Sequence, residues 1–212
     1  ALSGGVGRTD GAVIIAGTGS SALVRVGAER WQIGGWGHLI DDAGSGFDIG
    51  SRALKAVLRA FDGRGEPTAL TGLLEHRLGM PVNEAIPAIY AGGKQLIAGL
   101  ARLVLETDDP VARRIVAEEA AELAGIARAA AVHAAAAGAK GVFPIVMAGS
   151  IWQNESLRSQ AQGLAPHAIR WVAPSLPPVY GAAVEAAYDL GIHADAAFER
   201  AFAQSYARAC AG

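Results

Sequence analysis

The fold is decided at residues 12–33, which read AVIIAGTGSSALVRVGAERWQI. Three short apolar runs in this stretch have the length and composition of β-strands. These runs are residues 12–16, 22–26 and 31–33. The turns between them, GTGS at 17–20 and GAER at 27–30, are only long enough to join antiparallel neighbours. The sequence therefore predicts an N-terminal three-stranded antiparallel meander.

The turn at 17–20 also has the composition of an anion cradle. Glycines at two alternate positions let backbone amides curl around an anion, with the hydroxyls of Thr18 and Ser20 beside them. A glycine-rich hairpin turn needs no ligand, so this pattern alone leaves both interpretations open. A second loop at 34–50, GGWGHLIDDAGSGFDIG, combines many glycines with one tryptophan and three carboxylates. That combination favours a binding site.

Composition limits the classes of protein that this chain can belong to. With 212 residues, 51% hydrophobic and 18% charged, it is globular and fills one large domain or two small ones. A formal net charge of −2 with interleaved signs argues against nucleic acid and membrane partners. The single cysteine, Cys210, excludes an intrachain disulfide and a thiolate metal site, and we expect a cytoplasmic protein without a metal site of its own.

Helical patterns dominate the rest of the chain. We expect a helix capped by Ser45 or Asp48 that runs to about Phe61, and the longest helix from Asp109 to Gly138. Further helices are expected at 68–79, 83–91, 94–106, 154–164, 180–190 and 194–208, and buried strands at 142–148 and 169–172. We expect Leu70, Leu73, Leu74 and Leu78 to point inward, and Glu118, Glu119 and Glu122 to lie on the wetter side of the longest helix. Hairpin strands followed by alternating helices and strands indicate an α/β fold with a mixed sheet.

Four motifs in a fixed order resemble those of a known family. They are AGTGS at 16–20, GGWG at 34–37 leading to DAGSG at 42–46, MAGSIW at 147–152 and PPVYGAA at 177–183. Together they resemble the N-acetylglucosamine kinase and BadF/BadG/BcrA/BcrD ATPase family of the actin, hexokinase and Hsp70 superfamily. The resemblance implies a ribonuclease-H-like (actin-like ATPase) lobe with flanking helices, the C-terminal one of two similar lobes with ATP between them.

The resemblance also implies a division of labour between the lobes. The first lobe's Asp-Gly-Gly-Thr loop is absent from this sequence, and the family's catalytic Asp would lie just before Ala1. We therefore expect no catalytic residue in this chain and no kinase activity from the chain alone. The expected domains are the C-terminal lobe at 1–192, with a helical insertion at about 45–138, and a helix at 193–212 that packs on the N-terminal lobe.

Site residues follow from the resemblance, motif by motif. The residues expected to bind the ATP phosphates are Gly17, Thr18, Gly19 and Ser20. Those expected to bind adenosine are Gly149, Ser150 and Gly181, and those expected to bind the sugar are Gly35, Trp36, Gly37 and Asp42. Ordinary structural roles remain open for several of these: a core position for Trp36, a strand-to-helix turn for Gly149 and close helix packing for Gly181. Trp152 either flanks the nucleotide or packs.

The resemblance implies ATP-dependent phosphorylation of N-acetylglucosamine or glucosamine at the 6-hydroxyl, with ATP and Mg²⁺. Expected partners are the amino sugar, the N-terminal lobe and a second copy in a homodimer. Relatives carry Glu where this chain has Ala43, so a sugar contact is lost if that Glu touches the sugar. The alternatives are an ATPase that activates a dehydratase, which the single cysteine argues against, and a non-catalytic nucleotide-binding or dimerisation lobe.

Overall fold

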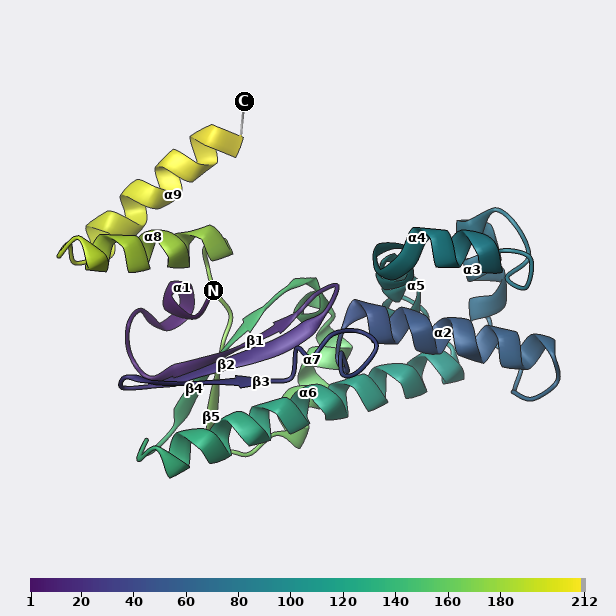
Figure 1. Cartoon of the computed structure of the whole chain (residues 1–212), viewed down its shortest axis with the longest axis horizontal. Coiled ribbons are helices and arrows are strands. Elements are labelled where there is room, and N and C mark those ends of the chain that lie inside the picture. Colours follow the sequence, from purple (N-terminus) through teal and green to yellow (C-terminus); the bar gives the residue numbers. More distant parts are fainter. Residues whose placement is uncertain (211–212) are drawn as a thin grey trace.

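A mixed sheet with the strand order β3-β2-β1-β4-β5 forms the centre of the molecule (Figure 1). The computed structural model describes residues 1–210. Within them the strands are β1 (Gly11–Ala16), β2 (Ser20–Val26), β3 (Glu29–Ile33), β4 (Phe143–Ala148) and β5 (Ile169–Val172). Neighbours among β1, β2 and β3 are antiparallel, whereas β4 runs parallel to β1 and β5 parallel to β4. The predicted meander is confirmed.

Successive side chains of a strand point to opposite faces of the sheet, so the apolar residues are divided between the two faces. Ala12 and Ile14 of β1 belong to the larger core, which includes the long helix α6 (Pro110–Ala136). Val13, between them, belongs to a smaller cluster with α1 (Leu2–Val6). The sheet is therefore covered by α6 on one face and by α1 with α8 (Pro178–Asp189) on the other (Figure 1). α7 (Glu155–Leu164) lies against α6.

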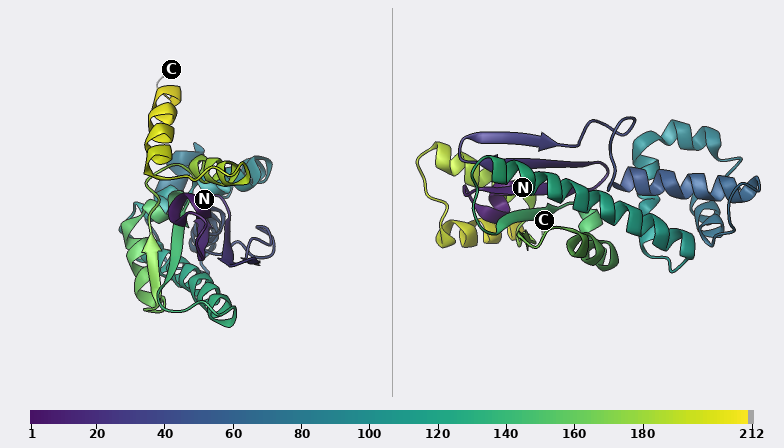
Figure 2. Two further views of the ribbon diagram at one scale, coloured as in Figure 1. Left: turned by 90° about the vertical axis from the view of Figure 1, so that its left-hand side faces the viewer. Right: turned by 90° about the horizontal axis from the view of Figure 1, so that it is seen from below.

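A group of helices stands at one end of the sheet, as two perpendicular views show (Figure 1 and Figure 2). Its members are α2 (Gly46–Phe61), α3 (Leu70–Leu78), α4 (Ile86–Gly99) and α5 (Ala101–Leu105). α4 passes so close to α2 that a Cβ on Gly50 would lie 1.9 Å from the carbonyl oxygen of Ile97. Only glycine permits this approach, which brings α4 toward the turn between β1 and β2.

The last helix, α9 (Ala196–Cys210), projects from the body of the molecule (Figure 2). It touches α8 through aromatic rings, with Tyr180 5.1 Å from Phe202 between ring centroids. None of the residues of α9 is buried. Its expected contact with another lobe stays a prediction.

Two helices begin at capping residues that the sequence predicts. The Ser45 hydroxyl accepts from the amide of Asp48, so Ser45 is the cap of α2 and Asp48 lies in its first turn. Asp109 caps α6 in the same way. Two expectations were wrong: Leu73 is 37% exposed, and Glu119 is completely buried. Neither α1 nor the short 3₁₀ helix η1 (Ser150–Gln153) was expected from the sequence.

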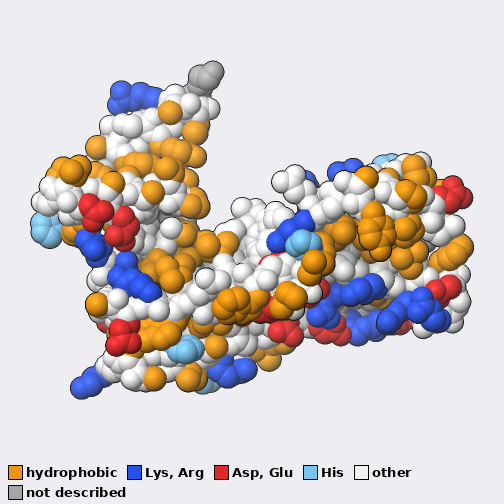
Figure 3. All heavy atoms as spheres, viewed as in Figure 1, with side chains coloured by type: hydrophobic (Ala, Val, Ile, Leu, Met, Phe, Trp, Pro, Cys, Tyr) orange, Lys and Arg blue, Asp and Glu red, His pale blue; other side chains and the backbone are white. Residues whose placement is uncertain are grey.

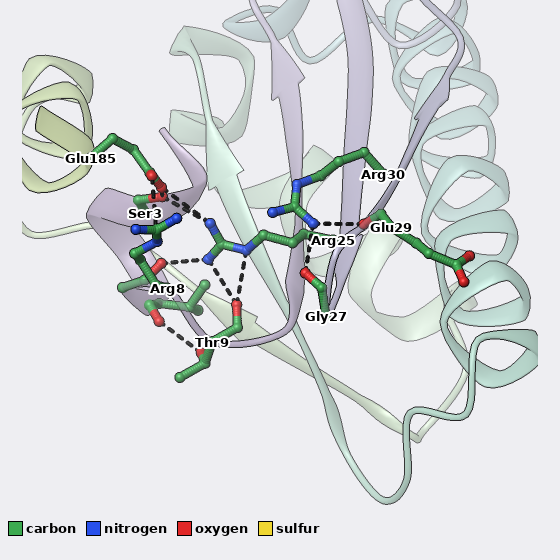
Figure 4. A network of polar contacts seen from close by, with 10 residues as sticks. Ser3, Arg8, Thr9, Arg25, Gly27, Glu29, Arg30 and Glu185 are labelled. Carbon is green, nitrogen blue, oxygen red and sulfur yellow. Dashed lines mark hydrogen bonds and ion pairs between the residues drawn. The ribbon is translucent and has the colours of Figure 1, made fainter. Parts of the chain in front are cut away.

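A buried arginine ties α1 to the sheet and to α8 (Figure 4). The Arg25 side chain, on β2, donates to the carbonyl oxygens of Gly7 and Thr9 at 2.5 and 2.8 Å. It also donates to the Ser3 hydroxyl, and it pairs with Glu185 of α8 at 3.2 Å. Donors of a buried guanidinium need such partners, so this network fixes the segment that leads into β1.

Candidate functional site

The turn at 17–20 is held by the first residues of α2. The carbonyl oxygen of Gly17 accepts from the amide of Gly46 at 2.7 Å, and that of Thr18 accepts from Phe47 at 3.2 Å. The free amides at the start of α2 are thus used inside the protein and are not available to an anion. The Ser20 hydroxyl donates to the carbonyl oxygen of Ala43 at 2.6 Å. Within the turn, the Gly17 amide donates to the carbonyl oxygen of Gly19, so phosphate binding here would depend on the amides of Thr18 and Gly19 and on the Thr18 hydroxyl.

A cavity of about 770 Å³ opens on one side of the turn. Gly17 and Thr18 line it together with Gly46, the end of α4, α5, and η1 with its flanking residues. Ligand sites for small molecules typically enclose about 300–1,000 Å³, so the space suits a nucleotide. The part of α4 and α5 in its wall could not be predicted from the sequence, because their helical pattern resembles that of any packed helix.

A smaller cavity, about 370 Å³, opens on the other side of the turn. Gly19 and Ser20 line it, and the structure brings them together with three residues of the next motif, Gly35, Gly37 and Asp42. The four predicted phosphate residues therefore divide two and two between adjacent cavities. An occupant of one cavity would lie next to an occupant of the other.

Asp42 is buried at the base of the smaller cavity, with both oxygens engaged. Oδ1 accepts from the amide of Ser20 at 2.8 Å, and Oδ2 lies 2.6 Å from Nζ of Lys94. The sequence did not identify Lys94, whose part in the site depends on the path of α4. Trp36 is 64% exposed, so it is not a core residue, and it does not line this cavity.

Of the residues expected to bind adenosine, Gly149 and Ser150 line a further cavity together, whereas Gly181 does not line it. Ser150 lines the larger cavity. Gly149 follows β4 and has φ 103° and ψ 162°, and a Cβ there would lie 2.2 Å from the carbonyl oxygen of Ala16. Gly181 lies at the crossing of α8 with α1, where a Cβ would come within 2.9 Å of the Gly4 amide nitrogen. Gly181 lines neither cavity, and its geometry is that of close helix packing. Its role toward adenosine stays a prediction.

Trp152, in η1, is buried. Its indole nitrogen donates to the carbonyl oxygen of Ile14 at 3.1 Å, and its ring packs against Trp171. These contacts show that Trp152 packs in the core; it also lines the cavity that contains Gly149 and Ser150, and its role beside the nucleotide stays a prediction.

Glu119 supports the loop that carries Asp42. Its Oε2 accepts from the amide of Gly44 at 2.6 Å, and its Oε1 lies 2.6 Å from Nε of Arg52. Burial, reinforced by the charge and hydrogen bonding of nearby Asp48, raises the pKa of Glu119 to about 8, against the opposing effects of the Gly44 amide and of Arg52. The carboxyl group is therefore a candidate for protonation near neutral pH.

The raised pKa of Glu119 predicts a pH-dependent stability. Because the folded carboxyl binds its proton more tightly than the unfolded one, the free energy of unfolding should decrease as pH rises from about 4.5 toward 8. Glu119→Gln should flatten this slope. Glu118→Gln is the control, since Glu118 pairs with the same Arg52 but is 49% exposed, and it should leave the slope unchanged. Thermal unfolding measured across this pH range checks both, and an unchanged slope in Glu119→Gln would contradict the expectation.

Neither a metal cluster nor a membrane span is found in residues 1–210. No group of three or more His, Cys, Asp or Glu side chains among them could hold a metal ion. None of the helices in that part of the chain is both long enough and apolar enough to cross a membrane.

Residues 1–186 match the BadF/BadG/BcrA/BcrD ATPase family. The chain belongs to this ATPase family. The match covers every site residue described above and both cavities. The fold predicted from the sequence, a ribonuclease-H-like lobe of the actin-like ATPase type, is confirmed.

Two proteins named as amino-sugar kinases are similar in sequence to parts of this chain. Over 130 residues the chain is 44% identical to N-acetylmuramic acid/N-acetylglucosamine kinase of Clostridium acetobutylicum. This alignment covers 58% of the chain and 42% of that protein. Over 89 residues the chain is 43% identical to N-acetyl-D-glucosamine kinase of Dictyostelium discoideum, covering 40% of the chain and 27% of that protein. The aligned part thus spans less than half the length of these relatives.

Two solved structures share the fold. A candidate N-acetylglucosamine kinase from Chromobacterium violaceum superposes with a TM-score of 0.68 at 26% identity, over 85% of this chain and 61% of that one. A candidate N-acetylglucosamine kinase from Porphyromonas gingivalis gives a TM-score of 0.67 at 16% identity, over 91% and 65% respectively. The second similarity concerns the fold alone.

Proposed function

We propose that this chain is the C-terminal half of an amino-sugar kinase, which transfers the γ-phosphate of ATP to the 6-hydroxyl of N-acetylglucosamine or glucosamine. The observation that carries the proposal is the turn at 17–20, which lies between a cavity of nucleotide size and a smaller one lined by Gly35, Gly37 and Asp42. The names of the relatives supply the class of substrate.

The proposed arrangement puts adenosine in the larger cavity and the sugar in the smaller one. The phosphates would cross the turn, where the amides of Thr18 and Gly19 and the hydroxyl of Thr18 can donate to them; the amides of Gly17 and Ser20 already donate to Gly19 and Asp42. In the reaction, the bond from the γ-phosphorus to the β–γ bridging oxygen breaks and a bond to the sugar 6-oxygen forms. A base takes the hydroxyl proton, and ADP leaves. Phosphoryl transfer needs mainly such positioning and neutralisation of charge.

The groups still required would come from outside the described cavities. We place the base in a segment before Ala1. Ala1 itself lines a further cavity together with Gly149 and Ser150. Mg²⁺ would enter with ATP, because it binds phosphate oxygens and keeps several of its waters. An N-terminal lobe would cover the hollow between α8–α9 and the helices α2 to α5 (Figure 3). We further propose a homodimer.

The test is sugar-dependent ADP formation by the full-length protein that contains this chain. We expect a 6-phosphorylated amino sugar, seen by ³¹P NMR, and much slower turnover with glucose. The 212-residue chain alone should show no turnover, since positioned proton transfer is worth about 10²- to 10⁴-fold and other contacts are missing as well. ADP formation that is independent of any sugar would overturn the proposal, and stoichiometric product from the chain alone would overturn its half-enzyme part.

A further inference from the structure

Lys94 reaches the turn because α4 is broken immediately before it. Gly93 has φ 57° and ψ −150°, a conformation outside the helical region, and the second half of α4 starts from there. That half is also the part that contacts Gly50 of α2 at Ile97. As a result, Nζ of Lys94 lies 2.9 Å from the point where a Cβ of Gly19 would stand.

Lys94 is also the cation best placed to meet a phosphate at the turn. Among the described residues that line the two cavities, the positively charged side chains are those of Lys94 and Arg102. Arg102 is 80% exposed and pairs with Glu106 on its own helical segment at 2.7 Å. The side chain of Lys94 is 32% exposed, in the cavity that holds Gly19 and Ser20.

The pair with Asp42 leaves Lys94 able to bind a second anion. An ammonium group has three donor hydrogens and rotates freely on a flexible stem. Asp42 has its other oxygen on the Ser20 amide, so this pair fixes Nζ beside the turn without exhausting its donors. A fixed ammonium in a partly enclosed site costs little reorganisation when charge arrives.

We propose that Lys94 binds the terminal phosphate of ATP, at the boundary between the two cavities, while it keeps its contact with Asp42. This inference rests on the proposed function, and it adds a residue that couples the helices α2 to α5 to the phosphate turn. A lysine in this place senses the γ-phosphate, so the site should distinguish ATP from ADP and AMP.

The test compares ATP, ADP and AMP binding by the full-length protein with and without the charge at position 94. In Lys94→Met the dissociation constant for ATP should rise about 10- to 100-fold, as expected for one charge-assisted hydrogen bond. The rise should be smaller for ADP and absent for AMP. Lys94→Arg should restore most of the affinity. Lys55→Met removes the same charge from an exposed position on α2 outside both cavities, and should leave ATP binding unchanged.

A double variant separates a direct contact from an effect through Asp42. If Lys94 contacts phosphate, Lys94→Met should still weaken ATP binding in an Asp42→Asn background. Loss of the effect in that background, or an equal effect on ATP and AMP, would overturn the inference and leave the proposed function standing. A wild-type protein that binds no ATP at all would overturn both. Lys94→Gln keeps much of the side chain's length and a polar donor at its end, and replaces Lys94→Met if that variant fails to fold.

Discussion

Replacing Gly149 by alanine is expected to destabilise the fold by about 3 kcal/mol or more. Gly149 occupies a backbone region that is essentially restricted to glycine, at φ 103° and ψ 162°, where strain alone costs about 1–3 kcal/mol for other residues. The added Cβ would in addition lie 2.2 Å from the carbonyl oxygen of Ala16, at the end of the central strand. Urea unfolding of the wild type and the variant measures the loss.

Gly138→Ala is the matched control for this prediction. Gly138 also has a positive φ, 86°, but a Cβ there would meet nothing within 4 Å. Its replacement should therefore cost only the conformational strain, about 1–2 kcal/mol. If Gly149→Ala proves no more costly than Gly138→Ala, the close approach of β4 to β1 at this point is not a constraint on the fold.

The second large effect is expected at Gly19 in the full-length protein. In Gly19→Val, the Cβ would lie 2.9 Å from both Oδ1 of Asp42 and Nζ of Lys94, so this ion pair and the turn must shift. A displacement of about 1 Å at a reacting centre typically lowers the rate about 100-fold. We therefore expect at least that loss in kcat/KM, together with weaker ATP binding. Steady-state kinetics and calorimetric titration with ATP provide the two measurements.

Gly163→Val controls for the general effect of a β-branched residue. Gly163 lies in α7, away from both cavities, and a Cβ there would meet nothing within 4 Å. This variant should keep wild-type ATP affinity while losing a little stability. Wild-type affinity in a folded Gly19→Val variant would remove the turn from the nucleotide site.

Local sequence signals predicted the meander and the helix caps because each depends on a few neighbouring residues. The strand at 142–148 was predicted from a continuous apolar run and observed from Phe143 to Ala148. Ser45 and Asp109 cap the helices that follow them, through hydrogen bonds that span two or three residues. The glycine-rich turn at 17–20 belongs to the same class of local signal.

The residues that sequence reasoning missed depend on contacts between distant segments. Glu119 follows another glutamate on an alanine-rich helix, a pattern typical of a solvated face, yet its partner Gly44 lies 75 positions away. Lys94 reaches Asp42 only because α4 is broken at Gly93 and crosses α2 at a glycine. α1 contains two glycines in five residues, and it packs against α8 at Gly181. Such pairings are set by the tertiary fold and leave no local signal.

A further polar groove, among the residues that the structure describes, could attract an anion. It lies between α2 and α6, has a volume of about 590 Å³, and carries basic and acidic side chains together. Its basic residues are Arg52, Lys55, Arg59, Arg64 and Arg114, and its acidic residues are Asp48, Glu66 and Glu118. Figure 3 shows the two signs of charge interleaved along this edge. Interleaving of this kind is typical of a solvated helix surface.

Titration of the ¹⁵N-labelled full-length protein with ATP, followed by amide NMR signals, distinguishes binding at the turn from binding in this groove directly. If the phosphates bind at the turn, the signals of Gly17, Thr18 and Gly19 should shift together with those of Gly99 and Ala101 in the larger cavity. Shifts confined to the groove between α2 and α6, or no shifts at millimolar ATP, would contradict nucleotide binding at the turn.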